Sequence, residues 1–326
     1  MNEIDAINEL FQPLTLGNKS ARDLQDDVAF LKFGGQSVVI TTDTLVEGTH
    51  FLPSDPIASV ARKLVRVNLS DIIAKGCAPI GVFLNISWPQ KTTSTDQTQF
   101  AAALGDDLRA ICGGVPLLGG DTTSIDGPMV ASLTMLGKPH GKKPIFRDGA
   151  KIGDMVFVTG TIGDALIGLE SLRKGSGIAR YQEAEAHYQV PNLPPISVSK
   201  LIAKFASASL DVSDGLLGDA AKLAQCSNLG IEINLEEIPI SNEAEQWLGQ
   251  GSDKLSALTE LATFGDDYQC LFTMSADNFR AIIEKGLFRE IQMRLIGKCV
   301  DGAGLTLTYE GKEIPTPLKL SFEHNF

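Results

Sequence analysis

Short apolar or β-branched segments alternate with helical segments along almost the whole chain, and this alternation limits the fold more than any other feature of the sequence. The expected strands are 37–42, 80–88, 129–136, 155–159, 231–235, 268–273, 291–299 and 305–309. The expected helices are 56–75, 95–112, 164–174, 198–208, one after 211–215, a helical region near 243–262, and 276–286. No fixed-period repeat is present. The pattern predicts an α/β or α+β class.

The length of 326 residues suggests two domains at about 150 residues each. The segment 137–149 is rich in Gly, Pro and Lys and is typical of a linker. We therefore expect an N-terminal domain over residues 1–138 and a C-terminal domain over residues 149–326.

Composition excludes several classes of protein. The chain has 28 basic and 40 acidic residues, a net charge of −12, which argues against a nucleic-acid partner. No apolar run approaches the roughly 18 residues of a membrane-spanning helix, so we expect no membrane partner. The N-terminus lacks a secretory signal, and the five cysteines form no CxxC pair. These features predict a cytoplasmic protein.

Aspartates recur beside expected strands and glycine-flanked turns. They are Asp43 (TTD), Asp121 (GGD), Asp211 and Asp214 (DVSDG), and the pairs Asp26-Asp27 and Asp266-Asp267. Carboxylates that converge at one sheet edge repel one another unless cations neutralise them, and Mg²⁺ prefers oxygen ligands. Taken singly, each Asp is better explained as a turn or cap residue, and it is their shared placement that favours a metal site. Asp214 before its helix and Asp55 before Pro56 are both plausible N-caps.

Asp71 is the most informative single aspartate because it lies in mid-helix among apolar residues. Asn68, Asp71 and Lys75 form one polar stripe, and Lys75 at i+4 is a possible ion-pair partner for Asp71. The run Gly160–Gly163 before a helix is suited either to binding a phosphate or simply to turning the chain. The sequence contains no P-loop, protein-kinase, HExxH or GxSxG motif.

Seven segments carry a resemblance to a known family. They are DD at 26–27, TTDTLVEGTHF at 41–51, NLSDIIAKG at 68–76, GGDTT at 119–123, VTGTIGDALIGL at 158–169, DVSDGL at 211–216 and GDDYQCLF at 265–272. In this order they resemble thiamine-monophosphate kinase, a member of the superfamily of aminoimidazole-ribonucleotide synthetase and selenophosphate synthetase. The resemblance runs from Asp26 to Phe322.

The resemblance implies a two-domain PurM-like (aminoimidazole-ribonucleotide synthetase-like) fold. Its N-terminal α/β domain would bind metal and nucleotide, and its sheet would pair with that of a second subunit to give a homodimer. Its C-terminal α+β domain would complete the ATP and substrate site. The implied reaction is Mg²⁺-dependent transfer of the γ-phosphate of ATP, the co-substrate, to thiamine monophosphate. An acceptor phosphate with a second pKa of about 6 is already ionised, so direct transfer needs no protein base.

The family also implies roles for individual residues. Several Mg²⁺ ions would be held by Asp27, Thr41, Thr42, Asp43, Asp71, Asp121, Asp211 and Asp214, of which Asp43, Asp71, Asp121 and Asp214 would be catalytic. ATP would contact Gly120, Asp121, Arg147 and Ser213. The thiamine moiety would contact His50, Asp266 and Phe322.

Two positions depart from the family pattern. Gln25 stands where Gly is usual before the first acidic pair, and Asp266 stands where Glu is more common. Asp266 could accept a hydrogen bond from the aminopyrimidine or attract the thiazolium charge. The alternatives are a ligase like aminoimidazole-ribonucleotide synthetase, although TLVEGTHF replaces its GTK-type segment, and a non-catalytic protein that binds cations or nucleotides.

Overall fold

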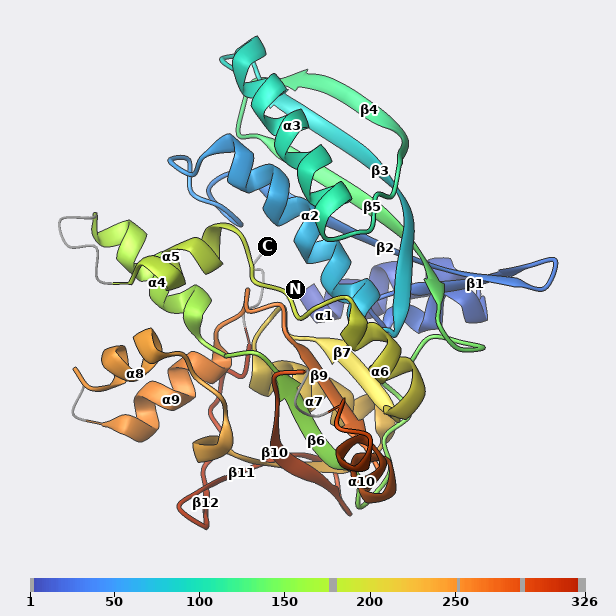
Figure 1. Ribbon diagram of the computed structural model, residues 1–326, viewed down its shortest axis with the longest axis vertical. Helices are drawn as coiled ribbons and strands as arrows, with labels where there is room; N and C mark the ends of the chain where they lie inside the picture. Colours follow the sequence, from blue (N-terminus) through green and yellow to red (C-terminus); the bar gives the residue numbers. More distant parts are fainter. Residues whose placement is uncertain (1–2, 176–180, 251–252, 288–290, 322–326) are drawn as a thin grey trace.

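The computed structural model describes residues 3–175, 181–250, 253–287 and 291–321 (Figure 1). Its strands form two sheets. The first has the order β1-β2-β5-β3-β4, with β1 at Ala29–Phe33, β2 at Gln36–Val46, β3 at Cys77–Pro89, β4 at Leu117–Ile125 and β5 at Val130–Pro139. The second has the order β12-β11-β8-β10-β6-β9-β7, with β6 at Met155–Thr159, β7 at Ala208–Asp211, β8 at Gly230–Asn234, β9 at Cys270–Met274, β10 at Met293–Val300, β11 at Gly304–Tyr309 and β12 at Lys312–Ile314.

Helices flank both sheets. Those nearest the first sheet are α2 (Ile57–Ala74) and α3 (Ser94–Ala110). The later helices are α4 (Asp164–Lys174), α5 (Gln182–Gln189), α6 (Ser197–Phe205), α7 (Leu216–Ser227), α8 (Asn242–Leu248), α9 (Lys254–Thr263) and α10 (Ala276–Glu284). Short helical turns, beginning with α1 (Glu3–Ala6), precede β1.

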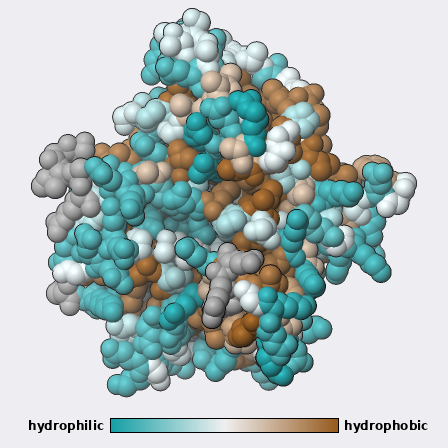
Figure 2. All heavy atoms as spheres, viewed as in Figure 1, coloured by the Kyte–Doolittle hydropathy of each residue, from teal (hydrophilic) through white to brown (hydrophobic). Residues whose placement is uncertain are grey.

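The two faces of the first sheet have different surroundings. On one face Val39, Thr41 and Leu45 are buried where α2 packs on β2. On the other face Thr42 and Thr44 are exposed. Hydrophobic side chains gather over the region of β3, β4 and β5 in Figure 2. Phe83 of β3 is one of the exposed hydrophobic residues of this sheet. The exposed face therefore carries both hydroxyl and apolar side chains. The expected strands 37–42, 80–88 and 129–136 have apolar residues on both alternating faces, which predicts a more uniformly apolar surface than the structure has.

Helix α2 is buried between the two halves of the molecule. It packs on β2, β3 and β5 of the first sheet and also on β7, β9 and α6 of the second half. Its polar residues are buried with its apolar ones, including Lys63, Asn68, Asp71 and Lys75. Charged groups on α2 therefore reach residues that are distant in sequence.

Several expected elements are confirmed, and several need correction. Strand 155–159 and helix 164–174 have the expected ends, whereas the region 243–262 is two helices, α8 and α9. Asp43 and Asp121 lie inside β2 and β4 rather than at strand ends, because the flanking Thr residues continue each strand. Asp55 is not the N-cap of α2: Pro56 occupies that position, and the Asp55 carboxylate accepts a hydrogen bond from the amide of Leu52.

We expect Gly168→Ala in α4 to destabilise the protein, because α4 and α5 approach closely there. An added Cβ would lie 2.1 Å from the carbonyl oxygen of Ala184. Overpacking of this kind costs about 1–3 kcal/mol, which outweighs the gain of about 1 kcal/mol in helix propensity. The matched control is Gly105→Ala in α3, where the nearest atom is the flexible Arg109 guanidinium at 3.3 Å. Thermal melts should show a loss for Gly168→Ala alone; equal effects would contradict the prediction.

Candidate active site

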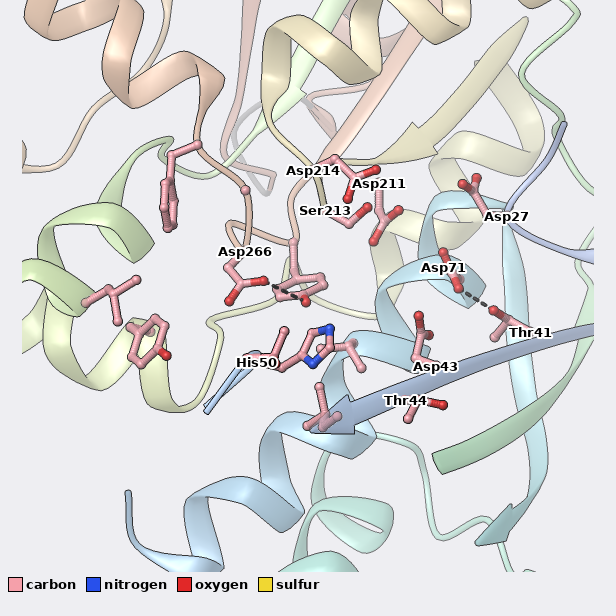
Figure 3. Close-up of a pocket in the computed structure, with 18 of the residues that line it drawn as sticks. Asp27, Thr41, Asp43, Thr44, His50, Asp71, Asp211, Ser213, Asp214 and Asp266 are labelled. Atoms are coloured by element: carbon pink, nitrogen blue, oxygen red, sulfur yellow. Dashed lines mark hydrogen bonds between the residues drawn. The ribbon is translucent and has the colours of Figure 1, made fainter. Parts of the chain in front are cut away.

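A cavity of about 380 Å³ lies where β2, α2 and the loops after β7 and before β9 meet. It is lined by Asp27, Thr41, Thr42, Asp43, His50, Asp71, Asp211, Ser213, Asp214 and Asp266, all of which were expected from the sequence (Figure 3). β1 pairs with β2 only up to Ile40, so the edge of β2 from Thr41 onward is not paired with β1. This edge brings Thr42 to the cavity although its side chain belongs to the exposed face.

A cluster of buried carboxylates forms one end of the cavity. Oxygens of Asp27, Asp71 and Asp211 lie within 4.8 Å of one another. They come from the segment before β1, from α2 and from the end of β7, and Thr41 donates a hydrogen bond to Asp71. Burial, reinforced by neighbouring carboxylates, raises the pKa values of Asp71 and Asp211 well above their ordinary range. Without a cation, these groups are therefore held in an unfavourable environment.

Two buried cations neutralise one side of this cluster. Although burial acts to raise the pKa of Asp27, Arg147 and Lys75 hold it well below its usual value. The Lys75 ammonium lies 2.5 Å from Asp27 and 3.0 Å from Asp26, and donates to the carbonyl of Ser209. The expected ion pair between Lys75 and Asp71 is therefore wrong. Lys75 is the C-cap of α2, and at this end of the helix its ammonium reaches the acidic pair before β1 and the carbonyl of Ser209 on β7.

The remaining carboxylates fit divalent cations. Burial and the charges of Asp27 and Asp214 raise the pKa of Asp43 to about 6. In the described chain, Oδ2 of Asp43 is buried without a hydrogen-bond partner. Asp214 is not an N-cap, since Gly215 holds that position, and its carboxylate pairs with Lys222. An all-oxygen donor set with excess negative charge and one unpartnered buried oxygen suits Mg²⁺.

The opposite end of the cavity is apolar and aromatic, with polar groups between the two ends. Leu169, Tyr188 and Phe264 line that end. In Figure 3, Asp266 and His50 lie between it and the acidic cluster. Nδ1 of His50 accepts a hydrogen bond from the amide of Val46, which orients the imidazole ring. The cavity thus joins a carboxylate end to an aromatic end.

Lys63 is a charged residue of this region that the sequence did not single out. Its ammonium is buried on α2 and contacts Asp266 at 2.8 Å. Val67 and Asp71 follow Lys63 at i+4 and i+8, so all three side chains lie on the same side of α2, about one turn apart. The sequence signal that could have identified Lys63 is its position among the apolar residues of the expected helix 56–75.

Three of the expected site residues lie elsewhere, and a fourth is not among the described residues. Arg147 is beside Asp27 but does not line the cavity. Gly120 and Asp121 are on β4, and Asp121 pairs in register with Asn85 on the exposed face. Asp43 is on the helix-covered face of β2, and β5 and β3 lie between β2 and β4. Phe322 lies outside the described residues.

The turn Gly160–Gly163 does not offer a phosphate site. The amides of Gly163 and Ala165, at the start of α4, donate to the carboxylate of Asp267 at 2.8 and 3.5 Å. These are the donors that a phosphate would use. The segment therefore turns the chain and binds Asp267.

We expect Asp71→Asn to stabilise the metal-free protein. The pKa of Asp71 is raised on folding, so the stability associated with its protonated form is present at low pH and is lost as the pH rises above its ordinary value of 3.8. The gain of Asp71→Asn over wild type in EDTA should therefore increase from about pH 5 to about pH 8, as followed by thermal melts. Mg²⁺ should then raise the melting temperature of wild type more than that of the variant.

The control for this measurement is Asp126→Asn, which changes an exposed carboxylate. It should leave both the pH dependence and the Mg²⁺ response unchanged. If Asp71→Asn were no more stable than wild type in EDTA, or responded equally to Mg²⁺, the assignment of a strained carboxylate cluster would be wrong.

Comparison with known proteins gives the family. The model for AIR synthase related protein, N-terminal domain, matches residues 25–138, and that for the C-terminal domain matches residues 151–310. The thiamine-monophosphate kinase of Caulobacter vibrioides is 36% identical over 99% of this chain and 90% of that protein. That of Aquifex aeolicus is 31% identical, covering 95% and 94% of the two chains.

Solved structures agree. A structure described as AaThiL complexed with AMPPCP and TMP has a TM-score of 0.83 at 28% identity, covering 99% of this chain and 97% of that chain. The thiamine-monophosphate kinase of Stenotrophomonas maltophilia has a TM-score of 0.73 at 28% identity, covering 94% and 98%. The hydrogenase maturation protein HypE in complex with ATP, at 18% identity and a TM-score of 0.69, shares the fold alone.

These findings confirm the two-domain PurM-like fold, and they do not favour the ligase or the non-catalytic alternative. No helix in the described part of the chain is both long and apolar enough to cross a bilayer. Because a relative is 36% identical over nearly the full length of both proteins, and both family models match in order, the chain belongs to the thiamine-monophosphate kinase family.

Proposed function

We propose that this protein transfers the γ-phosphate of ATP to thiamine monophosphate, giving thiamine diphosphate and ADP. The observation that carries the proposal is the single cavity with a carboxylate cluster at one end and an aromatic wall at the other. A substrate that carries a phosphate group and two heteroaromatic rings needs a metal-binding carboxylate surface for the phosphate and an aromatic surface for the rings. Family membership supports the same reaction.

The metal-binding residues proposed within one chain are Asp27, Thr41, Thr42, Asp43, Asp71, Asp211 and Asp214. The converging oxygens of Asp27, Asp71 and Asp211 and the unpartnered Oδ2 of Asp43 support this assignment. Bound Mg²⁺ ions would reduce the repulsion between the two phosphate groups and stabilise the transferring group. This donor set is large enough for several Mg²⁺ ions.

Nucleotide and substrate contacts are assigned to different residues around this cluster. For ATP we propose Ser213, which lines the cavity, and Arg147, whose guanidinium contacts Asp27 beside it, together with Gly120 and Asp121. For the thiamine moiety we propose His50, Asp266 and Phe322. The positions of His50 and Asp266 between the acidic and aromatic ends support their part of this assignment.

Transfer is proposed to be direct. An aspartyl-phosphate intermediate would need a carboxylate free of metal and in line with the γ-phosphorus, whereas the cavity's acidic end is a set of mutually close oxygens suited to shared cations. The described histidine that lines the cavity is His50, and it lies outside this cluster. The ionised acceptor phosphate makes a base unnecessary.

We further propose a homodimer in which Asp121 of one subunit completes the site of the other. Three strand spacings separate β4 from β2, about 14 Å at the usual 4.8 Å. Asp121 also lies on the exposed face, opposite to the face that carries Asp43. One chain therefore keeps these two carboxylates apart, whereas a second sheet packed on the exposed face could bring its Asp121 to the edge of β2 that is unpaired with β1 from Thr41 onward, where Thr42 and Thr44 line the cavity.

A cytoplasmic location is proposed from the cysteines. All five are free, and burial raises the pKa values of Cys77, Cys112 and Cys299 to about 12. Such thiols are unreactive and form no disulfide framework.

Asp43→Ala and Asp71→Ala should each lower kcat by at least about 100-fold, because each removes an oxygen ligand at the transferring phosphate. His140→Ala should change kcat little, since His140 contacts Ser199 rather than the cavity. Thiamine diphosphate formation, separated chromatographically from the substrate, is the measurement. His187→Ala should also retain catalysis, but with lower stability because this side chain is buried. A His140 variant as inactive as Asp43→Ala would refute the metal-centred site.

Mixing two inactive variants tests the shared site. Asp43→Ala and Asp121→Ala should each be inactive alone. In a mixed dimer one site carries both changes and the other carries neither. Random exchange makes half of the dimers mixed, so activity should recover to about a quarter of wild type. No recovery in mixed dimers purified through two different tags would show that Asp121 acts within its own chain or not at all.

A further inference from the structure

Lys63 joins three separate segments of the substrate end. Its side chain is 1% exposed, and its ammonium donates to Asp266 at 2.8 Å and to the carbonyl of His50 at 2.9 Å. The same ammonium lies 4.3 Å from the ring centroid of Tyr188. The contacts come from the loop after β2, from α5 and from the turn before β9. One buried cation thus fixes the walls on both sides of the cavity.

Asp266 is held in one orientation by these contacts. Oδ2 accepts from Lys63, and Oδ1 accepts from the hydroxyl of Tyr268 at 3.0 Å. Its backbone has a φ of +71° and its amide donates to the carbonyl of Ser213. A carboxylate has about four lone-pair sites, so about two remain for a ligand. The Asp266 side chain is 24% exposed and lines the cavity, where those sites are accessible.

The charges around Asp266 determine whether it can bind a ligand cation or a neutral hydrogen-bond donor. A buried ammonium needs a counter-charge, and Asp266 supplies it, so the pair together is close to neutral. Arg173 also lines the cavity and acts on Tyr188 electrostatically. A ligand cation placed beside Asp266 would meet both Lys63 and Arg173. A neutral hydrogen-bond donor would meet no such opposition.

We propose that Lys63 is a specificity-determining positioning residue: it neutralises Asp266 and aims its carboxylate as an acceptor for the exocyclic amino group of the aminopyrimidine, and not as the counter-ion of the thiazolium. This inference rests on the proposed function, since it names the substrate group that Asp266 recognises. The thiazolium then lies toward the acidic cluster, where uncompensated negative charge remains. The substrate's orientation in the cavity follows from this assignment.

The test compares thiamine monophosphate with its oxo analogue, in which a carbonyl replaces the amino group. Both molecules carry the thiazolium, so any discrimination must come from the pyrimidine edge, where the analogue has a carbonyl in place of the amino group and a hydrogen on the neighbouring ring nitrogen; Asp266→Asn then tests whether residue 266 reads that edge. Equilibrium binding in the presence of Mg²⁺ should favour thiamine monophosphate by about 100-fold or more, because the analogue sets an oxygen against a carboxylate. Asp266→Asn supplies an amide NH₂ to that oxygen and should reduce the preference to about 10-fold or less.

Lys63→Met should weaken binding of thiamine monophosphate by about 10-fold or more and raise its KM, with the KM for ATP nearly unchanged. Lys63→Arg should restore part of the affinity because it keeps the positive charge. Lys91→Met is the matched control, since Lys91 is 80% exposed and away from the cavity. The double variant Lys63→Met/Asp266→Asn carries no unpaired buried charge, so it remains a folded reference if Lys63→Met does not fold. It should show the relaxed preference of Asp266→Asn.

The outcomes separate this inference from the proposed function. If wild type and Asp266→Asn show the same preference between the two ligands, or wild type shows none, Asp266 acts as a counter-ion or not at all and the inference is overturned. An unchanged affinity in Lys63→Met would overturn it equally. Discrimination without formation of thiamine diphosphate would overturn the proposed reaction alone. Failure to bind either ligand would overturn both.

Discussion

Burial of α2 on both sides is the constraint on which the rest of the site depends. A charge on such a helix must be paired or share a cation, and its buried charges do so with segments that are distant in the sequence. Lys63 pairs with Asp266, Asp71 joins Asp27 and Asp211, and Lys75 pairs with the acidic pair before β1. Lys63 and Asp71 are eight residues apart, about 12 Å along the helix. The helix thereby sets the separation between the substrate end and the metal end.

The carboxylate cluster places a functional demand on stability. Buried carboxylates so close together resist ionisation, as the raised pKa values of Asp71 and Asp211 indicate. Arg147 and Lys75 relieve this only at Asp27. Under the proposed function, the remaining negative charge would attract divalent cations and, through them, phosphate groups. The arrangement that destabilises the metal-free chain is thus the one that would make it a phosphotransferase.

The exposed face of the first sheet connects assembly to catalysis. In register across this face lie Thr44, Ser132, Asn85 and Asp121, one from each of four neighbouring strands. Thr44 and Ser132 hydrogen-bond to each other. A row of polar residues bordered by apolar ones such as Phe83 suits a partner sheet that also brings a carboxylate to the opposite site. Under this proposal the dimer is part of the catalytic apparatus and not only a means of covering apolar surface.

The sequence by itself determined the class of fold, the family and half of the residues that line the cavity. Local patterns were sufficient for this, because strand and helix periods, together with seven ordered motifs, depend on neighbouring residues. Only the tertiary structure decided which partners the charges have. Lys75 contacts Asp27 rather than Asp71, Lys63 contacts Asp266, and the amides of the turn 160–163 bind Asp267. It also placed Asp43 and Asp121 on opposite faces of one sheet. The physical reason is that the partner of a buried charge on α2 is chosen by the packing of this helix between two sheets. This packing brings together residues from about 50 to about 200 positions apart, as in Lys75 with Asp27 and Lys63 with Asp266, and leaves no trace in local spacing.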